Sequence, residues 1–359
     1  MSEPRLRWGI LGAANIARKN WLAIRNSGNS VVAAIASRDH ARANKFIEEC
    51  QLEAPMKERP EALDDYEELI QSPLVDAVYV PLPTGLRKEW VLSAARARKH
   101  VLCEKPCALS VADLREMTDA CARNGVQFLD GVMFMHSERL ARMRQVLDDT
   151  EKMGQLRRIA SAFCFLGSPE FFDANIRTDS RLEPFGCLGD LGWYCIRLAL
   201  WVMNWQMPRS VSGRVLTESR RAGQGAVPTE FSGELLFEGG ISSSFYCSFM
   251  TTNQQWAHIS GTKGYLRLND FVLPYVGDKL TFEMGSDVFS IEGCDFRMQP
   301  HVQEIGTVEY SQGNPKAQET NMFRNLANHV LSGKLNAQWP EMALKTQEVM
   351  CRCLESTRA

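Results

Sequence analysis

The sequence Gly9-Ile10-Leu11-Gly12-Ala13-Ala14-Asn15-Ile16-Ala17 joins an apolar run at Leu6–Leu11 to a helical pattern. Small residues between a strand and a helix are typical of a dinucleotide-binding turn, where a first glycine makes the bend and later small residues let the backbone approach a pyrophosphate. We assign the bend to Gly12 and the later positions to Ala14 and Ala17. Backbone N–H groups at the helix start would bind the phosphates; they belong to Ala14, Asn15 and Ile16. Small residues at such a junction also serve packing alone, so the neighbouring sequence must decide.

Strand-like and helical patterns alternate over residues 1–132, which predicts parallel βαβ units. The expected strands are Leu6–Leu11, Val31–Ser37, Val75–Val80, His100–Cys103 and Val126–Val132. The expected helices are Asn15–Ser27, Ala41–Cys50, Asp65–Ser72, Leu86–Lys99 and one that Ser110 caps and that ends at Gly125. We therefore predict an α/β Rossmann domain over residues 1–132.

The pattern changes in the second half of the chain. Alternation of period two predicts strands at Arg158–Leu166, Ser210–Thr217, Glu230–Phe237 and Ile241–Phe249. Turn residues at 238–240 and 261–264 indicate hairpins, so we expect an antiparallel meander. Helices are expected at Cys187–Trp205, Met322–Leu331 and Glu341–Ser356. Residues 133–359 are thus predicted to form an α+β domain with an open, mainly antiparallel sheet, whose C-terminal helix is free to pack back on the Rossmann domain.

Composition excludes several classes of protein. The 359 residues carry 41 Lys and Arg against 43 Asp and Glu without a basic block, so we expect no nucleic-acid or membrane partner. There is no export signal and no apolar run of spanning length, which predicts a cytoplasmic protein. The 11 cysteines are scattered and lack zinc spacing, so we expect reduced thiols and no metal site. The motifs of P-loop NTPases, zincins and serine hydrolases do not occur.

The second strand ends in Ser37-Arg38-Asp39. NAD enzymes commonly place a carboxylate here for the ribose 2′-hydroxyl, whereas a hydroxyl followed by a guanidinium suits a 2′-phosphate. Ser37 and Arg38 therefore favour NADP(H), and Asp39 leaves NAD(H) open as the alternative.

The segment His100-Val101-Leu102-Cys103-Glu104-Lys105-Pro106 is the most specific motif in the chain. Together with Val75–Pro81 and the N-terminal turn, it resembles the glucose–fructose oxidoreductase / inositol dehydrogenase (Gfo/Idh/MocA) family, in the branch that contains dimeric dihydrodiol dehydrogenases and NADP-dependent D-xylose dehydrogenases. The resemblance implies a Rossmann domain followed by an open-sheet domain, an active site between the two, and a homodimer formed through the C-terminal sheet.

The resemblance also implies roles for particular residues. Lys105 would lie near nicotinamide and substrate, where its charge stabilises a developing alkoxide. Tyr194, in the motif Gly186–Tyr194, would be the general acid/base, with Asp190 on the same helical face holding substrate or orienting the pair. Further residues expected at the cofactor are Leu82, Thr84, Glu104 and Pro106. Arg87 stands where many members of the family have histidine, and is expected either at a phosphate or in solvent.

Three aromatic residues are expected at the substrate: Phe134, His136 and Trp193. His136 could equally be a linker residue, and Trp193 could equally be an ordinary core residue. The resulting hypothesis is an NAD(P)-dependent dehydrogenase or reductase of carbohydrate metabolism that prefers NADP. It would transfer a hydride between nicotinamide and a carbinol or carbonyl carbon of a sugar, polyol or cyclic diol. A non-catalytic dinucleotide sensor and a cofactor-assisted glycoside-processing enzyme are the alternatives.

Overall fold

The computed structural model describes residues 4–358, which form two compact units. The first unit comprises Met1–His136, Asp179–Pro184 and Gln312–Glu348. The second unit comprises Ser137–Thr178, Phe185–Ser311 and Val349–Ala359. The chain therefore passes several times between the units, and each unit combines segments that are distant in sequence.

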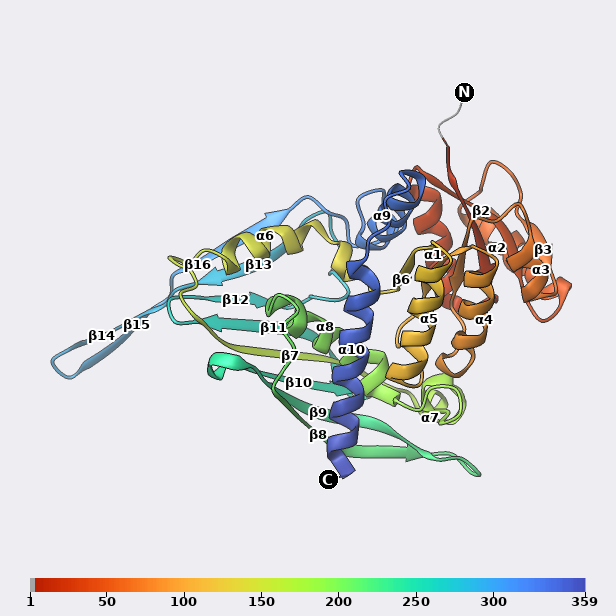
Figure 1. Ribbon diagram of the computed structural model, residues 1–359. Helices are drawn as coiled ribbons and strands as arrows, with labels where there is room; N and C mark the ends of the chain where they lie inside the picture. Colours follow the sequence, from red (N-terminus) through yellow and green to blue (C-terminus); the bar gives the residue numbers. More distant parts are fainter. Residues whose placement is uncertain (1–3, 359) are drawn as a thin grey trace. The chain divides into compact units, whose positions relative to one another are not determined.

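The first unit contains a six-stranded parallel sheet in the order β3-β2-β1-β4-β5-β6. Figure 1 labels three of its strands, β2, β3 and β6, among the helices of this unit. Its strands are β1 (Leu6–Leu11), β2 (Ser30–Ala36), β3 (Glu61–Leu63), β4 (Ala77–Val80), β5 (His100–Cys103) and β6 (Phe128–Asp130). This is the doubly wound order in which the connections reverse direction between β1 and β4. The predicted Rossmann fold is confirmed, and the short edge strand β3 is the one strand of this sheet that the sequence pattern missed.

Helices cover both faces of this sheet. They are α1 (Asn15–Asn26), α2 (His40–Glu53), α3 (Tyr66–Gln71), α4 (Thr84–Arg96), α5 (Val111–Arg123) and, from the far end of the chain, α9 (Gln318–Leu331). Helices α1, α2 and α9 share one hydrophobic cluster with the sheet, while α3, α4 and α5 pack on the other face. Ser110 caps α5 as predicted, because its hydroxyl accepts the Asp113 N–H at 3.1 Å.

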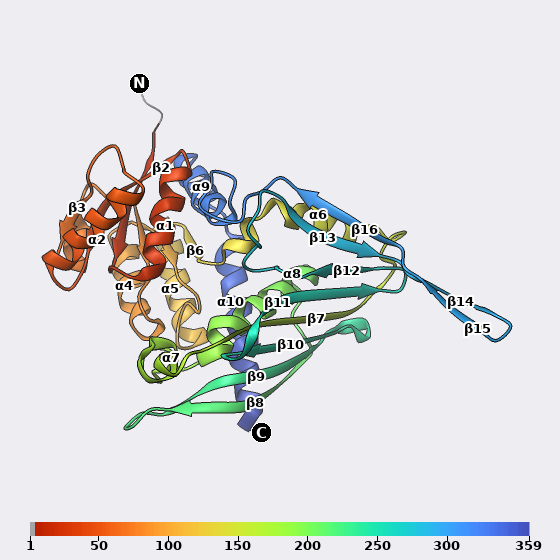
Figure 2. The same cartoon turned by 180° about the vertical axis from the view of Figure 1, so that it is seen from behind.

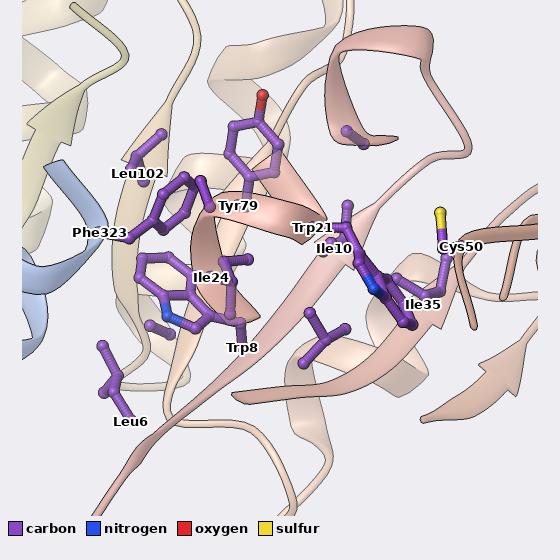
Figure 3. Packing of buried hydrophobic residues seen from close by; sticks show 14 of the residues in the cluster. Leu6, Trp8, Ile10, Trp21, Ile24, Ile35, Cys50, Tyr79, Leu102 and Phe323 are labelled. Atoms are coloured by element: carbon purple, nitrogen blue, oxygen red, sulfur yellow. The ribbon is translucent and has the colours of Figure 1, made fainter. Parts of the chain in front are cut away.

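The centre of the first unit's core joins its N-terminal strand to α9 (Figure 3). The Phe323 ring stands edge-on to Trp8, with ring centroids 5.1 Å apart, and to Tyr79 at 5.9 Å. All three side chains are buried. Because Phe323 follows Trp8 by more than 300 residues, part of the Rossmann core is completed only after most of the second unit has been synthesised.

The second unit contains an eight-stranded sheet in the order β16-β13-β12-β11-β7-β10-β9-β8. Its strands are β7 (Leu156–Leu166), β8 (Ser210–Arg220), β9 (Ala226–Leu236), β10 (Ser242–Ser248), β11 (Met250–Gly261), β12 (Tyr265–Leu268), β13 (Leu280–Gly285) and β16 (Val302–Thr307). The predicted open, mainly antiparallel sheet is confirmed. The expected simple meander is wrong at the centre, where β7 and β10 run parallel. A parallel pair needs a long crossover, and the helical segment between β7 and β8 is part of that connection.

One face of this sheet is covered by helices of the same unit. The predicted helix over Cys187–Trp205 consists of a π-helical turn, η3 (Leu188–Gly192), followed by α8 (Trp193–Val202). These elements pack on β7, β9 and β10, where the alternating side chains Phe231, Phe245 and Cys247 are buried. Helix α6 (Glu138–Leu147) packs on β13 and β16, while α7 (Pro169–Ala174) lies on the connection after β7.

A two-stranded hairpin extends beyond β13 and β16 in both views (Figure 2). Its strands are β14 (Val288–Glu292) and β15 (Asp295–Gln299), and its Phe289 and Phe296 rings stack at 6.0 Å while remaining exposed. The final long helix is α10 (Gln338–Glu355). Within residues 4–358, no helix is long and apolar enough to cross a membrane.

Candidate functional site

Gly12 makes the bend after β1 as predicted, with a φ of +100°. A Cβ at this position would lie 3.3 Å from both the Leu82 side chain and the Tyr66 hydroxyl, so glycine fits the conformation and the space. The bend leads into α1, whose N-cap, Ala14, provides no side-chain cap, and the first turn of this helix holds no acidic residue. A helix start without such groups leaves its N–H dipoles available to an anion, and this suits a pyrophosphate.

The other residues of this turn divide between solvent and core. Asn15 and Ile16 are exposed, and Ala14 is partly exposed. Ala17 is fully buried in the cluster between α1 and the sheet. A small residue here allows close packing of helix against sheet, which is the part that the third glycine of a dinucleotide-binding turn plays.

The end of β2 presents positive charge. Ser37 is buried and Arg38 is exposed. The carboxylate of Asp39 accepts the Arg42 N–H at 2.7 Å and so caps α2. Burial raises the pKa of the Tyr66 phenol, and the nearby charges of Arg38 and Arg42 oppose that rise. Two guanidinium groups therefore lie near Tyr66, whose hydroxyl borders the Gly12 bend; Arg42, which completes this basic pair, was missed in the sequence pattern.

The turn after β5 carries Glu104, Lys105 and Pro106. The Glu104 carboxylate accepts a hydrogen bond from the Tyr79 hydroxyl at 2.6 Å, and that hydroxyl accepts one from Asn20 at 2.6 Å. Burial, followed by the Glu104 charge, raises the pKa of Tyr79 well above its usual value, so the phenol stays a proton donor to Glu104. Glu104 therefore anchors the turn to the sheet. The half-buried Lys105 follows it, and the Lys105–Pro106 peptide bond is cis.

Leu82 and Thr84, both expected at the cofactor, lie after β4. Leu82 is buried beside the position of a Gly12 Cβ, which places it against the N-terminal bend. Thr84 is also buried, and its hydroxyl lies 2.6 Å from Glu183 Oε2. Arg87 is buried too and binds backbone carbonyls, including that of Leu82 at 2.7 Å. The expectation that Arg87 lies at a phosphate or in solvent is therefore wrong. Glu183, whose side chain is partly exposed, is a further contributor that the sequence pattern did not reveal.

Phe134 and His136 belong to η1 (Met133–His136), a 3-10 turn after β6 in the first unit. Phe134 is buried. The His136 ring lies 3.1 Å from the Asn325 side-chain nitrogen and 5.8 Å from the Trp339 ring. Residues near the C-terminus therefore fix His136, and its expected substrate role stays a prediction.

Asp190 and Tyr194 belong to the second unit. Asp190 lies in the π-helical turn η3, a helix type that often marks functional sites. Its Oδ2 accepts a hydrogen bond from Arg177 Nε at 2.7 Å. Tyr194 follows in the first turn of α8, largely buried, with its ring 5.6 Å from Phe163. Trp193 is fully buried 5.8 Å below the Arg197 guanidinium, which favours the core alternative for this residue.

Among residues 4–358, no group of three or more His, Cys, Asp and Glu side chains is placed to hold a metal ion. In the first unit, the candidate residues Gly12, Ser37, Leu82 and Glu104 follow the carboxyl ends of β1, β2, β4 and β5. These ends share one edge of the parallel sheet, on both sides of the point where the strand order reverses, and this is where open α/β sheets bind ligands. The donor groups present fit a dinucleotide.

Residues 6–132 match the family model described as "Oxidoreductase family, NAD-binding Rossmann fold", and residues 140–267 match the "GFO/IDH/MocA C-terminal domain". The D-xylose 1-dehydrogenase (NADP(+)) 2 of Haloferax volcanii is 32% identical over 264 residues, which cover 74% of this chain and 76% of that protein. The chain belongs to the Gfo/Idh/MocA family of oxidoreductases.

Other Gfo/Idh/MocA relatives agree with the branch predicted from the sequence. The trans-1,2-dihydrobenzene-1,2-diol dehydrogenase of Mus musculus is 29% identical over 311 residues, covering 83% of this chain and 87% of that one. The fold is similar to that of a 3-ketoreductase from Actinomadura kijaniata, solved in complex with NADP and TDP-benzene, with a TM-score of 0.81 at 24% identity and 98% coverage of both chains. The protein is therefore an NAD(P)-dependent dehydrogenase or reductase.

Proposed function

We propose that this family member is an NADP(H)-preferring oxidoreductase. The reaction we propose is hydride transfer between nicotinamide and a carbinol or carbonyl carbon of a sugar, polyol or cyclic diol. The preference for NADP(H) over NAD(H) rests on the residues that follow β2. There, the Asp39 carboxylate caps α2, while Arg38 and Arg42 supply positive charge. A capping carboxylate is committed to backbone N–H groups, whereas guanidinium groups pair well with a phosphate. The NADP-dependent xylose dehydrogenase relative supports the same preference.

In the proposed reaction, two side chains act on the substrate oxygen and a third positions them or the substrate. The bound nicotinamide supplies or accepts the hydride. Tyr194 exchanges a proton with the substrate oxygen, and Lys105 stabilises negative charge as it develops on that oxygen. Asp190, held by Arg177, hydrogen-bonds substrate or orients the pair. The cofactor would contact the Gly12–Ile16 turn, Ser37, Arg38, Leu82, Thr84 and the Glu104–Pro106 turn.

The substrate class is proposed from the relatives together with the site. The relatives act on xylose and on a dihydrodiol, as their names state, and both substrates carry vicinal hydroxyl groups on a small carbon frame. Phe134 and His136 are the proposed substrate contacts in the first unit. We further propose that residues 1–132 bind the cofactor and residues 133–359 bind substrate and form a homodimer through the sheet, in a cytoplasmic setting. Light scattering of the purified protein tests the dimer.

The test of this function is absorbance at the nicotinamide band. Purified protein is incubated with NADP⁺, and separately with NAD⁺, across aldoses, inositols and trans-dihydrodiols. Reduction of NADP⁺ by one substrate class supports the proposal. Cofactor binding without turnover over a wide panel would favour a dinucleotide sensor instead, and product formation without net cofactor reduction would favour glycoside processing.

A further inference from the structure

The segment Asp179–Pro184, called the strap below, belongs to the first unit although its neighbours in sequence, Thr178 and Phe185, belong to the second. The strap lies directly on the start of helix α4. Its Leu182 carbonyl accepts the Gly85 N–H at 3.1 Å. A Cβ at Gly85 would approach the Arg181 carbonyl oxygen to 2.8 Å, so the strap can lie this close only because position 85 is glycine.

Glu183 of the strap completes the N-terminus of α4. The N-cap residue of this helix, Pro83, makes no side-chain cap hydrogen bond. Glu183 Oε1 accepts the Thr84 N–H at 2.9 Å, and Oε2 lies 2.6 Å from the Thr84 hydroxyl. A carboxylate here satisfies an N–H group of the first turn and interacts favourably with the helix dipole.

Glu183 is also the acidic partner of Arg87. Their closest side-chain atoms, Arg87 Nη2 and Glu183 Oε1, lie 3.8 Å apart, and the two side chains are only 6% and 12% exposed. Removing the carboxylate would leave a buried guanidinium without this counter-charge, which is costly in a buried site. Glu183 therefore holds Arg87 in place.

Arg87 and Thr84 both reach the turn that carries Lys105. Arg87 donates to the carbonyl oxygen of Pro106, the residue directly after Lys105, and the Thr84 hydroxyl lies 3.2 Å from the same oxygen. The Tyr79–Glu104 hydrogen bond anchors the other side of this turn. Lys105 is thus flanked by two anchored residues, and one of the two anchors depends on the strap.

We propose that Glu183 is a positioning residue, which acts through Arg87 and Thr84 to fix the turn that presents Lys105. The inference rests on the proposed role of Lys105 in the reaction. Supporting groups that lock the orientation of a reacting group affect the rate without touching the substrate, because the reacting group must be held within narrow limits.

The first test is a double-variant cycle in kcat with the substrate class found by the absorbance screen. Glu183→Gln should lower kcat about tenfold or more. The NADPH dissociation constant measured by fluorescence should rise by a smaller factor than kcat falls, because Glu183 supports Thr84 and the turn, which are also proposed cofactor contacts. In a Lys105→Ala background the same substitution should cost less than about twofold, because two residues that act through one group are not additive. The matched control, Glu89→Gln, removes an exposed carboxylate from the same helix and should leave kcat unchanged.

Gly85→Ala provides an independent perturbation. Alanine favours a helix more than glycine does, so α4 itself should not be weakened, whereas the new Cβ pushes the strap away. It should reproduce the loss in kcat and the non-additivity with Lys105→Ala. This variant also keeps the cycle measurable if Glu183→Gln does not fold.

The second readout is hydrogen exchange of the peptide that spans residues 103–110, followed by mass spectrometry without cofactor or substrate. Glu183→Gln and Gly85→Ala should both speed deuterium uptake there, and Glu89→Gln should not. Unchanged uptake, or the full loss in kcat recurring in the Lys105→Ala background, would overturn the positioning role. If Lys105→Ala itself retains the wild-type rate, the proposed function of Lys105 fails, while the exchange measurement still shows whether the strap holds the turn.

Discussion

The Asp39 carboxylate accepts the backbone N–H of Arg42 at 2.7 Å, so the acidic residue that follows the second strand serves helix α2. The same stretch also carries positive charge. The charges of Arg38 and Arg42 both oppose the rise in the pKa of Tyr66, whose hydroxyl lies beside the Gly12 bend. One short segment thus caps the start of α2 with a carboxylate and carries two arginines whose charges act on Tyr66, the residue next to the Gly12 bend.

Arg38→Ala and Arg42→Ala should each weaken NADPH binding. A hydrogen bond to a charged group contributes about 1.5–3 kcal/mol, so each dissociation constant should rise roughly 10- to 100-fold. NADH lacks the 2′-phosphate, and its affinity should change less than about twofold. Fluorescence titration with both cofactors measures the difference. Arg115→Ala, an exposed arginine on α5, is the control; an equal loss for NADH would contradict the 2′-phosphate role.

Asp39→Ala separates capping from cofactor choice. Loss of the N-cap should lower the free energy of unfolding by about 0.5–2 kcal/mol, whereas the ratio of the NADPH and NADH affinities should stay the same. Denaturant unfolding and the same fluorescence titrations measure the two effects. Glu53→Ala, at the exposed end of the same helix, is the stability control. A selective loss of NADH binding in Asp39→Ala would mean that this carboxylate serves the ribose after all.

Phe323→Ala tests whether α9 is part of the Rossmann core. The ring is fully buried against Trp8 and Tyr79, and its removal should cost about 3–5 kcal/mol. Thermal unfolding followed by circular dichroism is the measurement. Leu331→Ala, a truncation of an exposed apolar residue on the same helix, should have little effect. Equal losses of stability in the two variants would contradict the claim that the contacts of Phe323 with Trp8 and Tyr79 stabilise the Rossmann core.

The sequence pattern was most informative where its signals are local. The bend at Gly12, the strand before Lys105 and the Ser110 cap each depend on residues within one strand–turn–helix unit, and the structure has all three. The predictions failed where the partners are far apart in the chain. Glu183 meets Thr84 across 99 residues, and nothing near Thr84-Gly85 indicates which carboxylate will cap the helix.

The second unit shows the same limit. Alternation of period two identified β7–β10, because each strand has one buried face. It could not reveal that β7 lies between β10 and β11. Side-chain alternation shows which face of a strand is buried, but it does not show which strands are its neighbours or in which direction they run. The hairpin β14–β15 was missed because its side chains are mostly exposed on both faces, so no buried stripe marks it.

Glu309 should make stability depend on pH. It is buried after β16, where its Oε2 accepts the Ser137 hydroxyl at 3.0 Å and the Glu138 N–H at 2.7 Å. Its Oε1 has no hydrogen-bond partner among residues 4–358. Burial is the largest influence and raises the pKa of this carboxyl to about 7, although the two hydrogen bonds and Arg139 oppose the rise.

The sign of that dependence follows from the raised pKa. Between its ordinary value and about 7 the folded protein binds more protons at Glu309 than the unfolded chain, so stability should fall as pH rises through this window. Glu309→Gln should flatten the dependence by at most about 3 kcal/mol between pH ~4.5 and ~7. Denaturant unfolding at several pH values measures it, with Glu218→Gln, which removes an exposed carboxylate of the same unit, as the control. An identical pH profile for wild type and Glu309→Gln would contradict the raised pKa.

The central claim is that Tyr194 exchanges the substrate proton during hydride transfer to or from the nicotinamide. The most direct measurement is the rate of absorbance change at the nicotinamide band for wild type and Tyr194→Phe, with NADP⁺ and the substrate class identified by the screen. Loss of a general acid/base should slow turnover by roughly 10²- to 10⁴-fold while the NADPH dissociation constant is kept. A Tyr194→Phe protein that turns over near the wild-type rate would contradict the account.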